Sequence, residues 1–74
     1  MFKEKLKKLR EDKGLTQQEL ANQLFVTRSA VAKWEQGRGI PNPDSIDAIA
    51  DFFAIDQKEL FNEQDVIEVL YTIQ

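Results

Sequence analysis

Apolar residues recur at helical spacing in four separate stretches of the chain. A period of three to four residues places the apolar side chains of each stretch on one face of a helix. The four stripes are Phe2, Leu6 and Leu9; Leu20, Ala21 and Leu24; Val31 and Trp34 beside Ala30; and Ile46, Ile49, Ala50 and Phe53. The pattern predicts an all-α fold whose helices bury these stripes against one another.

Polar residues that cap helices precede three of the stripes. Thr16 is followed three residues later by Glu19, which is the pattern of a capping box. Thr27 is placed to cap the helix that carries Val31 and Trp34. Asn42 precedes Pro43, a residue favoured at the first position of a helix. The helix starts are therefore well marked.

Helix ends and a fifth helix are also indicated. Gly14 and Gly37 are placed to end helices in the left-handed conformation, and residues 39–43 are predicted to form a loop. Asp56 and Glu59 repeat the capping-box pattern. The predicted helices span residues 2–13, 16–24, 27–36, 43–53 and 56–61.

The last thirteen residues, 62–74, fit two patterns and form a predicted C-terminal extension of the domain that spans residues 1–61. A helical stripe is given by Val66, Val69, Leu70 and Ile73, and a strand-like alternation by Ile67, Val69, Tyr71 and Ile73. A helix is favoured over a strand because the segment begins with cap-like residues. Its apolar side chains either pack back on the domain or contact a partner, such as a second copy.

The composition excludes much chemistry. With 74 residues the chain makes one domain, and it contains neither cysteine nor histidine. Disulfides, thiolate sites, ordinary zinc sites and imidazole acid–base chemistry are excluded, so no catalytic, metal or cofactor site is expected. No apolar run spans a bilayer, and the lysine-rich start lacks the core of a signal peptide. The expectation is a cytoplasmic protein without enzyme activity or an evident small-molecule site.

Charge is distributed unevenly along the chain. Residues 1–39 carry nine Lys/Arg against five acids, a net +4, whereas residues 40–74 carry one lysine against eight acids, a net −7, which together give the overall −3. Such asymmetry fits a first half that meets a polyanion, or simply two solvated surfaces.

The stretch from Thr27 to Gly37 suggests which surface that is. Opposite the apolar stripe, one helical face carries Arg28, Ser29, Ala32, Lys33 and Gln36, with two cations and no acid. Such donors suit phosphates and base edges, so the hypothesis is a helix that reads the major groove of DNA. The helices before and after Phe25-Val26 lie one tight turn apart, as in a helix-turn-helix.

Two runs, Leu15–Ala21 and Val26–Gly37, resemble the Cro and phage-repressor type of helix-turn-helix, also called the xenobiotic response element family. The likeness continues through Ile40–Pro43 and the stripe after it, and covers about residues 3–61. It implies a compact five-helix DNA-binding domain. Members usually act as homodimers on palindromic double-stranded operators and usually repress transcription.

The resemblance also implies roles for individual residues. Arg28, Ser29 and Lys33 match positions that face base edges, and Ala32 beside them is placed to touch a thymine methyl group. The positions that hold the DNA backbone are matched by Gln17, Thr27, Gln36 and Arg38. Arg10 and Glu35 match a pair whose salt bridge joins the first helix to the third.

Phe25 departs from the family pattern, because relatives commonly have glycine in this turn. If the position needs a positive φ, phenylalanine there costs on the order of 1 kcal/mol or more. We therefore expect either a relaxed turn or a buried ring that offsets the cost. A different functional class also stays open: an antitoxin-like or other interaction module whose acidic second half binds a partner protein.

Overall fold

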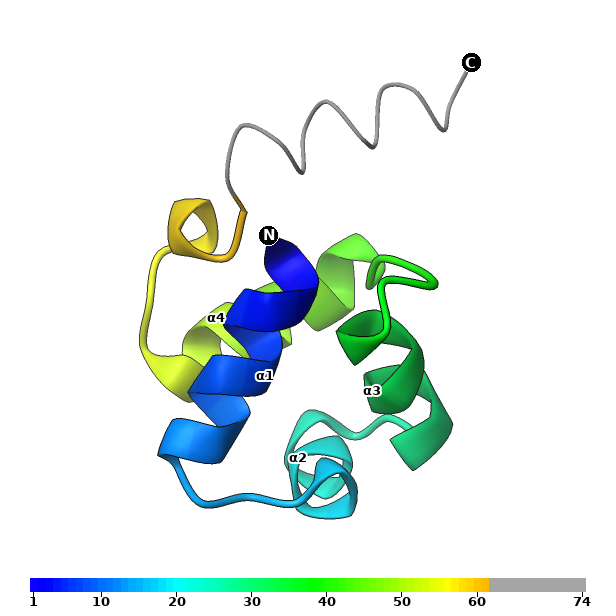
Figure 1. Cartoon of the computed structure of the whole chain (residues 1–74). Coiled ribbons are helices and arrows are strands. Elements are labelled where there is room, and N and C mark those ends of the chain that lie inside the picture. Colours follow the sequence, from blue (N-terminus) through cyan, green and yellow to red (C-terminus); the bar gives the residue numbers. More distant parts are fainter. Residues whose placement is uncertain (62–74) are drawn as a thin grey trace.

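The computed structural model describes residues 1–61 and shows only helical elements within that range (Figure 1). The α-helices are α1 (Phe2–Asp12), α2 (Gln17–Leu24), α3 (Arg28–Glu35) and α4 (Pro43–Phe53), followed by the 3₁₀ turn η1 (Gln57–Glu59). The predicted all-α class is confirmed. The predicted extension 62–74, with its choice between helix and strand, lies outside the described residues.

The helices α2, α3 and α4 each begin where a side chain caps the first turn. The hydroxyl of Thr16 accepts the backbone N–H of Glu19 at 3.1 Å, while the Glu19 carboxylate accepts that of Thr16 at 2.9 Å. Thr27 and Asn42 cap α3 and α4 in the same way, from the backbone N–H groups of Ala30 and Ser45. Each cap satisfies an N–H that the helix itself leaves without a partner.

All four α-helices end in one geometry. A residue with a positive φ stands one or two positions after each helix end, and the N–H of the residue that follows it returns to the carbonyl five residues back. The positive-φ residues are Gly14, Phe25, Gly37 and Ala54, with φ of 70°, 57°, 71° and 55°. The returning bonds are Leu15 to Arg10, Val26 to Ala21, Arg38 to Lys33, and Ile55 to Ala50, at 2.9–3.1 Å.

Phe25 does not behave as the sequence led us to expect. The turn keeps the left-handed geometry, with φ 57° and ψ 41°, and the ring is 95% exposed rather than buried. Val26, the next residue, packs against the core instead. Because the chain turns sharply here, Phe25 and Val26 point in different directions. Val26 points inward, and Phe25 is left outside.

The predicted fifth α-helix is wrong: residues 56–61 form only the three-residue 3₁₀ turn η1. The carboxylate of Asp56 accepts the N–H of Lys58 at 2.9 Å, not that of Glu59 as a capping box would. Glu59 and Leu60 then bond to the carbonyls three residues back. A single 3₁₀ turn is enough to bring Leu60 into the core, where it is 1% exposed.

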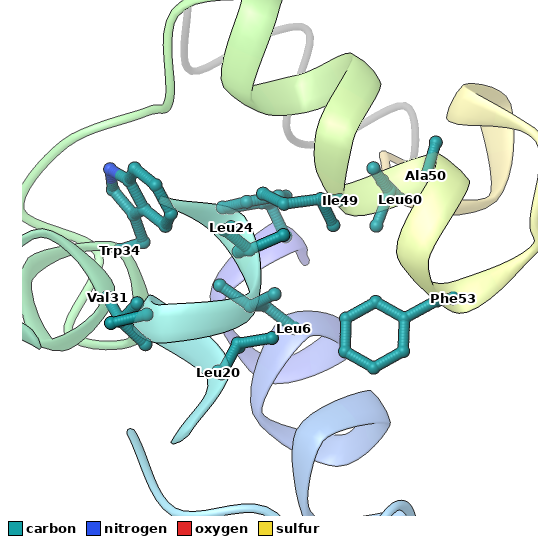
Figure 2. Packing of buried hydrophobic residues seen from close by; sticks show 11 residues of the cluster. Leu6, Leu20, Leu24, Val31, Trp34, Ile49, Ala50, Phe53 and Leu60 are labelled. Atoms are coloured by element: carbon teal, nitrogen blue, oxygen red, sulfur yellow. The ribbon is translucent and has the colours of Figure 1, made fainter. Parts of the chain in front are cut away.

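Eleven buried side chains form a single core that all four helices and the residue after η1 supply (Figure 2). In the view of Figure 2, Leu6 and Leu20 lie in the middle, with Trp34 on one side and Phe53 on the other. Leu6, Leu20, Val31 and Ile49 are fully buried. As predicted, Val31 and Trp34 belong to this core. The helix α3 packs against α2 and α1, so its opposite face is left at the surface.

The remaining phenylalanines also have packing roles. Phe61 stacks on Phe2 with ring centroids 5.0 Å apart, which joins the end of the described chain to its start. Phe52 contacts the edge of Phe53, and the ammonium of Lys13 lies 4.8 Å from the centre of the Phe52 ring. These contacts bring the first and last helices of the domain together.

Candidate nucleic-acid interface

The two faces of α3 differ sharply in burial. Val31 is fully buried and Trp34 is 8% exposed, so one face of the helix is committed to the core. The side chains of Arg28, Ser29 and Lys33 are exposed on the other, and Ala32 is half-buried beside them. The four residues expected to read bases therefore lie on the outward face of α3, within about one and a half turns of the helix.

The N-terminal end of α3 is held by Thr27. Its hydroxyl oxygen accepts the N–H of Ala30 at 3.1 Å, which orients the side chain at the start of the helix. The hydroxyl proton stays available for an acceptor such as a phosphate oxygen. The capping role and the expected contact with the DNA backbone are thus compatible.

Gln36 and Arg38 lie together at the other end of α3. The guanidinium Nη1 of Arg38 is 3.5 Å from the side-chain oxygen of Gln36, and both residues are exposed. The backbone N–H of Arg38 returns to the carbonyl of Lys33 at 2.9 Å. This bond fixes the direction in which Arg38 leaves the helix.

An ion pair ties α3 to α1. Two guanidinium N–H groups of Arg10 donate to the two carboxylate oxygens of Glu35 at 2.7 and 2.9 Å. A third donates to the carbonyl of Leu15 at 2.8 Å. The side chains are only 12% and 4% exposed, respectively. The hydrogen bond to Glu35 raises the pKa of Arg10, so its guanidinium stays charged under all ordinary conditions.

Gln17 also forms a hydrogen bond to this ion pair, which the sequence did not indicate. Its amide nitrogen donates to Glu35 at 3.3 Å, and the side chain is half-buried. The bond fastens the first turn of α2 to the last turn of α3. Gln17 therefore presents a fixed amide at the N-terminal end of α2, where the helix dipole favours an anion.

Lys3 is a further cation at the end of α3 that sequence analysis did not single out. A Cβ placed on Gly37 would lie 2.9 Å from the Lys3 Cδ and 3.5 Å from its Nζ. The lysine stem thus packs over Gly37, beside Gln36 and Arg38. Two features favour glycine at position 37: its φ of 71° and the close approach of Lys3. The first follows from the end of α3 itself, and the second depends on the packing of α1.

The charges around α3 favour an anionic partner. Between Glu19 and Glu35 the chain has two cations and no acid, and both glutamates are occupied by hydrogen bonds. The acids Asp44, Asp47 and Asp51 lie on α4, where Asp47 accepts a hydrogen bond from Gln57. The exposed charges of α3 are thus basic and those of α4 acidic.

Other kinds of site are not evident in residues 1–61. Over that range no group of three or more acidic residues is arranged to hold a metal ion. None of the helices there combines the length and the apolar character that crossing a membrane requires.

Comparison with known proteins agrees with this architecture. A family model described as helix-turn-helix matches residues 6–60. The chain is 45% identical over 71 residues to the HTH-type transcriptional activator BcrR of Enterococcus faecalis, covering 96% of this chain and 35% of that protein. It is 28% identical over 65 residues to the cryptic phage CTXphi transcriptional repressor RstR of Vibrio cholerae, covering 88% and 59%.

A solved structure has the same fold. The solution structure of the SOS-response transcriptional repressor LexA from Eubacterium rectale superposes with a TM-score of 0.79 at 30% identity, covering 82% of this chain and 65% of that one. The chain belongs to the helix-turn-helix family, as the resemblance predicted. It spans only about a third of the length of the activator and about three fifths of that of the phage repressor.

Proposed function

We propose that this protein is a transcription regulator that binds double-stranded DNA sequence-specifically, with α3 in the major groove. The observation that carries the proposal is the divided surface of α3. Its inner face is locked into the core by Val31 and Trp34, and its outer face presents Arg28, Ser29 and Lys33. A rigid helix with exposed donors and no exposed acid is suited to reading base edges.

The contacts divide into two kinds. Arg28 forms two parallel hydrogen bonds to a guanine, Ser29 and Lys33 add base-edge contacts, and Ala32 touches a thymine methyl group. The DNA backbone is held by residues at the ends of the helices, namely Gln17, Thr27, Gln36 and Arg38. The backbone contacts set the register of the protein on the duplex, and the base contacts set its sequence preference.

We further propose that the protein binds as a homodimer to a palindromic site and represses transcription. Two copies place their α3 helices about 34 Å apart, on one face of the duplex. Occupation of promoter DNA blocks polymerase without any further contact, which is why repression is favoured. The relatives include both an activator and a repressor, so the direction needs its own test.

The decisive experiment is selection of bound duplexes from a random pool by the full chain, at a stated salt concentration. The expected result is an enriched motif with two half-sites about one helical turn apart, bound at least about a thousandfold more tightly than random DNA. No preference over random duplex contradicts the proposal. A reporter gene behind the selected site should then fall in expression when the protein is present, and a rise contradicts repression.

A further inference from the structure

Phe25 costs the fold free energy through its backbone and gains none through its ring. Its φ of 57° is a conformation that side chains with a Cβ disfavour, and its ring is 95% exposed to water. Ile40 is the next most exposed large apolar residue of the described chain, at 49%. Glycine at position 25 would remove the backbone strain without losing any packing.

The fold itself gains nothing from the ring. The turn is closed by main-chain bonds, from the N–H groups of Phe25 and Val26 to the carbonyls of Asn22 and Ala21. The apolar contact that such a turn needs is made by Val26, which packs against the core. Gly14 and Gly37 close the same turn after α1 and α3 with no side chain at all. Residues 1–61, the part of the chain that the structure describes, therefore make no use of the Phe25 ring.

Its position in the chain places Phe25 close to the proposed DNA-reading face. Phe25 is three residues before Arg28, so the two Cα atoms are at most about 11 Å apart. The flanking exposed residues Gln23 and Thr27 are polar, and no acid occurs between Glu19 and Glu35. A polyanion that docks on α3 is thus attracted to this turn as well.

We propose that Phe25 is an apolar DNA contact at the leading end of the reading helix. The ring packs against C–H surface of the duplex, which is presented by thymine methyl groups in the major groove and by deoxyribose. This contact rests on the proposed function, because it requires α3 to enter the groove. It adds a second apolar contact, besides that of Ala32, to a face whose other residues are hydrogen-bond donors.

The test compares full-length variants on a duplex selected by the wild-type protein. Phe25→Gly and Phe25→Asn remove the ring and suit a positive φ, so both are expected to raise the midpoint of unfolding and yet weaken DNA binding about tenfold. Phe25→Tyr keeps the ring and should retain the affinity. Ala54→Gly relieves the same backbone geometry after α4 and should leave DNA binding unchanged.

A second arm replaces the thymines of the duplex one at a time by deoxyuridine, which lacks the methyl group. If one of these replacements weakens binding by the wild type and leaves binding by Phe25→Gly unchanged, the ring contacts the methyl group of that thymine. If Phe25→Gly binds every duplex more weakly than the wild type, and by the same factor, the ring contacts deoxyribose. Either result supports the proposal.

Two results would overturn it. One is equal affinity of Phe25→Gly and the wild type on the selected duplex. The other is a change in the oligomeric state of the free protein on Phe25→Gly, measured by sedimentation, which makes a second copy the partner of the ring. Failure of the proposed function is distinguishable, because the wild type itself would then select no duplex.

Discussion

The carboxylate of Glu35 accepts two hydrogen bonds from the guanidinium of Arg10, at 2.7 and 2.9 Å, and so fastens α3 to α1. Glu35 also accepts one from Gln17, so three helices meet at this carboxylate. These bonds keep the charge of Glu35 away from the surface of α3, since its side chain is only 4% exposed. An unpaired acid here would repel an approaching phosphate, so the ion pair serves both the fold and the basic surface.

Removing one partner of this ion pair should be costly. We expect Arg10→Met to lower the free energy of unfolding by about 3 kcal/mol, because it leaves the Glu35 carboxylate buried without a cation. Arg10→Met combined with Glu35→Met should lose less than Arg10→Met alone. Urea unfolding measures both variants.

The matched control is Lys8→Met, which breaks an exposed ion pair to Asp12 on the same helix. That change should cost about 0.5 kcal/mol or less. A cost for Arg10→Met no larger than that for Lys8→Met contradicts a structural role for the ion pair.

Arg28 is expected to carry base specificity. Arg28→Ala should weaken binding to the selected duplex by roughly 1–3 kcal/mol and relax the preference at one base position. Lys58→Ala, which removes an exposed cation in η1, is the matched control and should have little effect. If Arg28→Ala weakens binding equally on selected and random duplexes, Arg28 contacts phosphate only.

Arg38 is expected to contact phosphate instead. Arg38→Ala should weaken binding to every duplex to a similar degree, because phosphates carry no sequence information. The slope of log affinity against log salt should fall by about 1, since one fewer counterion is released. Titration at several salt concentrations measures the slope, and an unchanged slope speaks against the contact.

The helix-ending geometry predicts opposite effects at two exposed positions. Ala54→Gly should stabilise the protein by about 1 kcal/mol, because glycine adopts the φ of 55° without strain. Gly14→Ala should destabilise it by a similar amount, since φ is 70° there and a Cβ would meet no atom within 4 Å. Thermal unfolding of the pair tests this, and shifts of the same sign contradict it.

Glu19 makes the start of α2 sensitive to acid. Hydrogen bonds from the backbone and side chain of Thr16 lower the pKa of Glu19, so the ionised carboxylate is favoured in the folded state. Its stabilising effect is fully present above the ordinary carboxyl pKa of about 4.3 and is lost as the pH falls through the lowered value. Glu19→Gln keeps a capping side chain without the charge.

The unfolding midpoints of the wild type and Glu19→Gln, followed from pH 7 downward, measure this effect. The wild type should be the more stable at pH 7, and the difference should shrink below about pH 4. A difference that is constant over this range contradicts the assignment.

Local patterns were enough to predict most elements of this domain. The starts of α2, α3 and α4 follow from neighbours in the chain, because each capping side chain accepts the N–H of the residue three positions later. The capping residues are Thr16, Thr27 and Asn42. The burial of Val31 and Trp34 likewise follows from the helical period. The predicted fifth helix was wrong: Asp56 caps Lys58 and not Glu59, and the segment forms one 3₁₀ turn before the buried Leu60.

The sequence by itself therefore determined where the helices begin, which of their faces are apolar and which helix bears the exposed cations, since these depend on contacts within a few residues. Only the tertiary structure brought Gln17 to Glu35 and Lys3 over Gly37, because the partners come from different helices. It also left Phe25 outside, since the core was already filled through Val26. Contacts between distant segments depend on how the helices pack, and no local pattern encodes that arrangement.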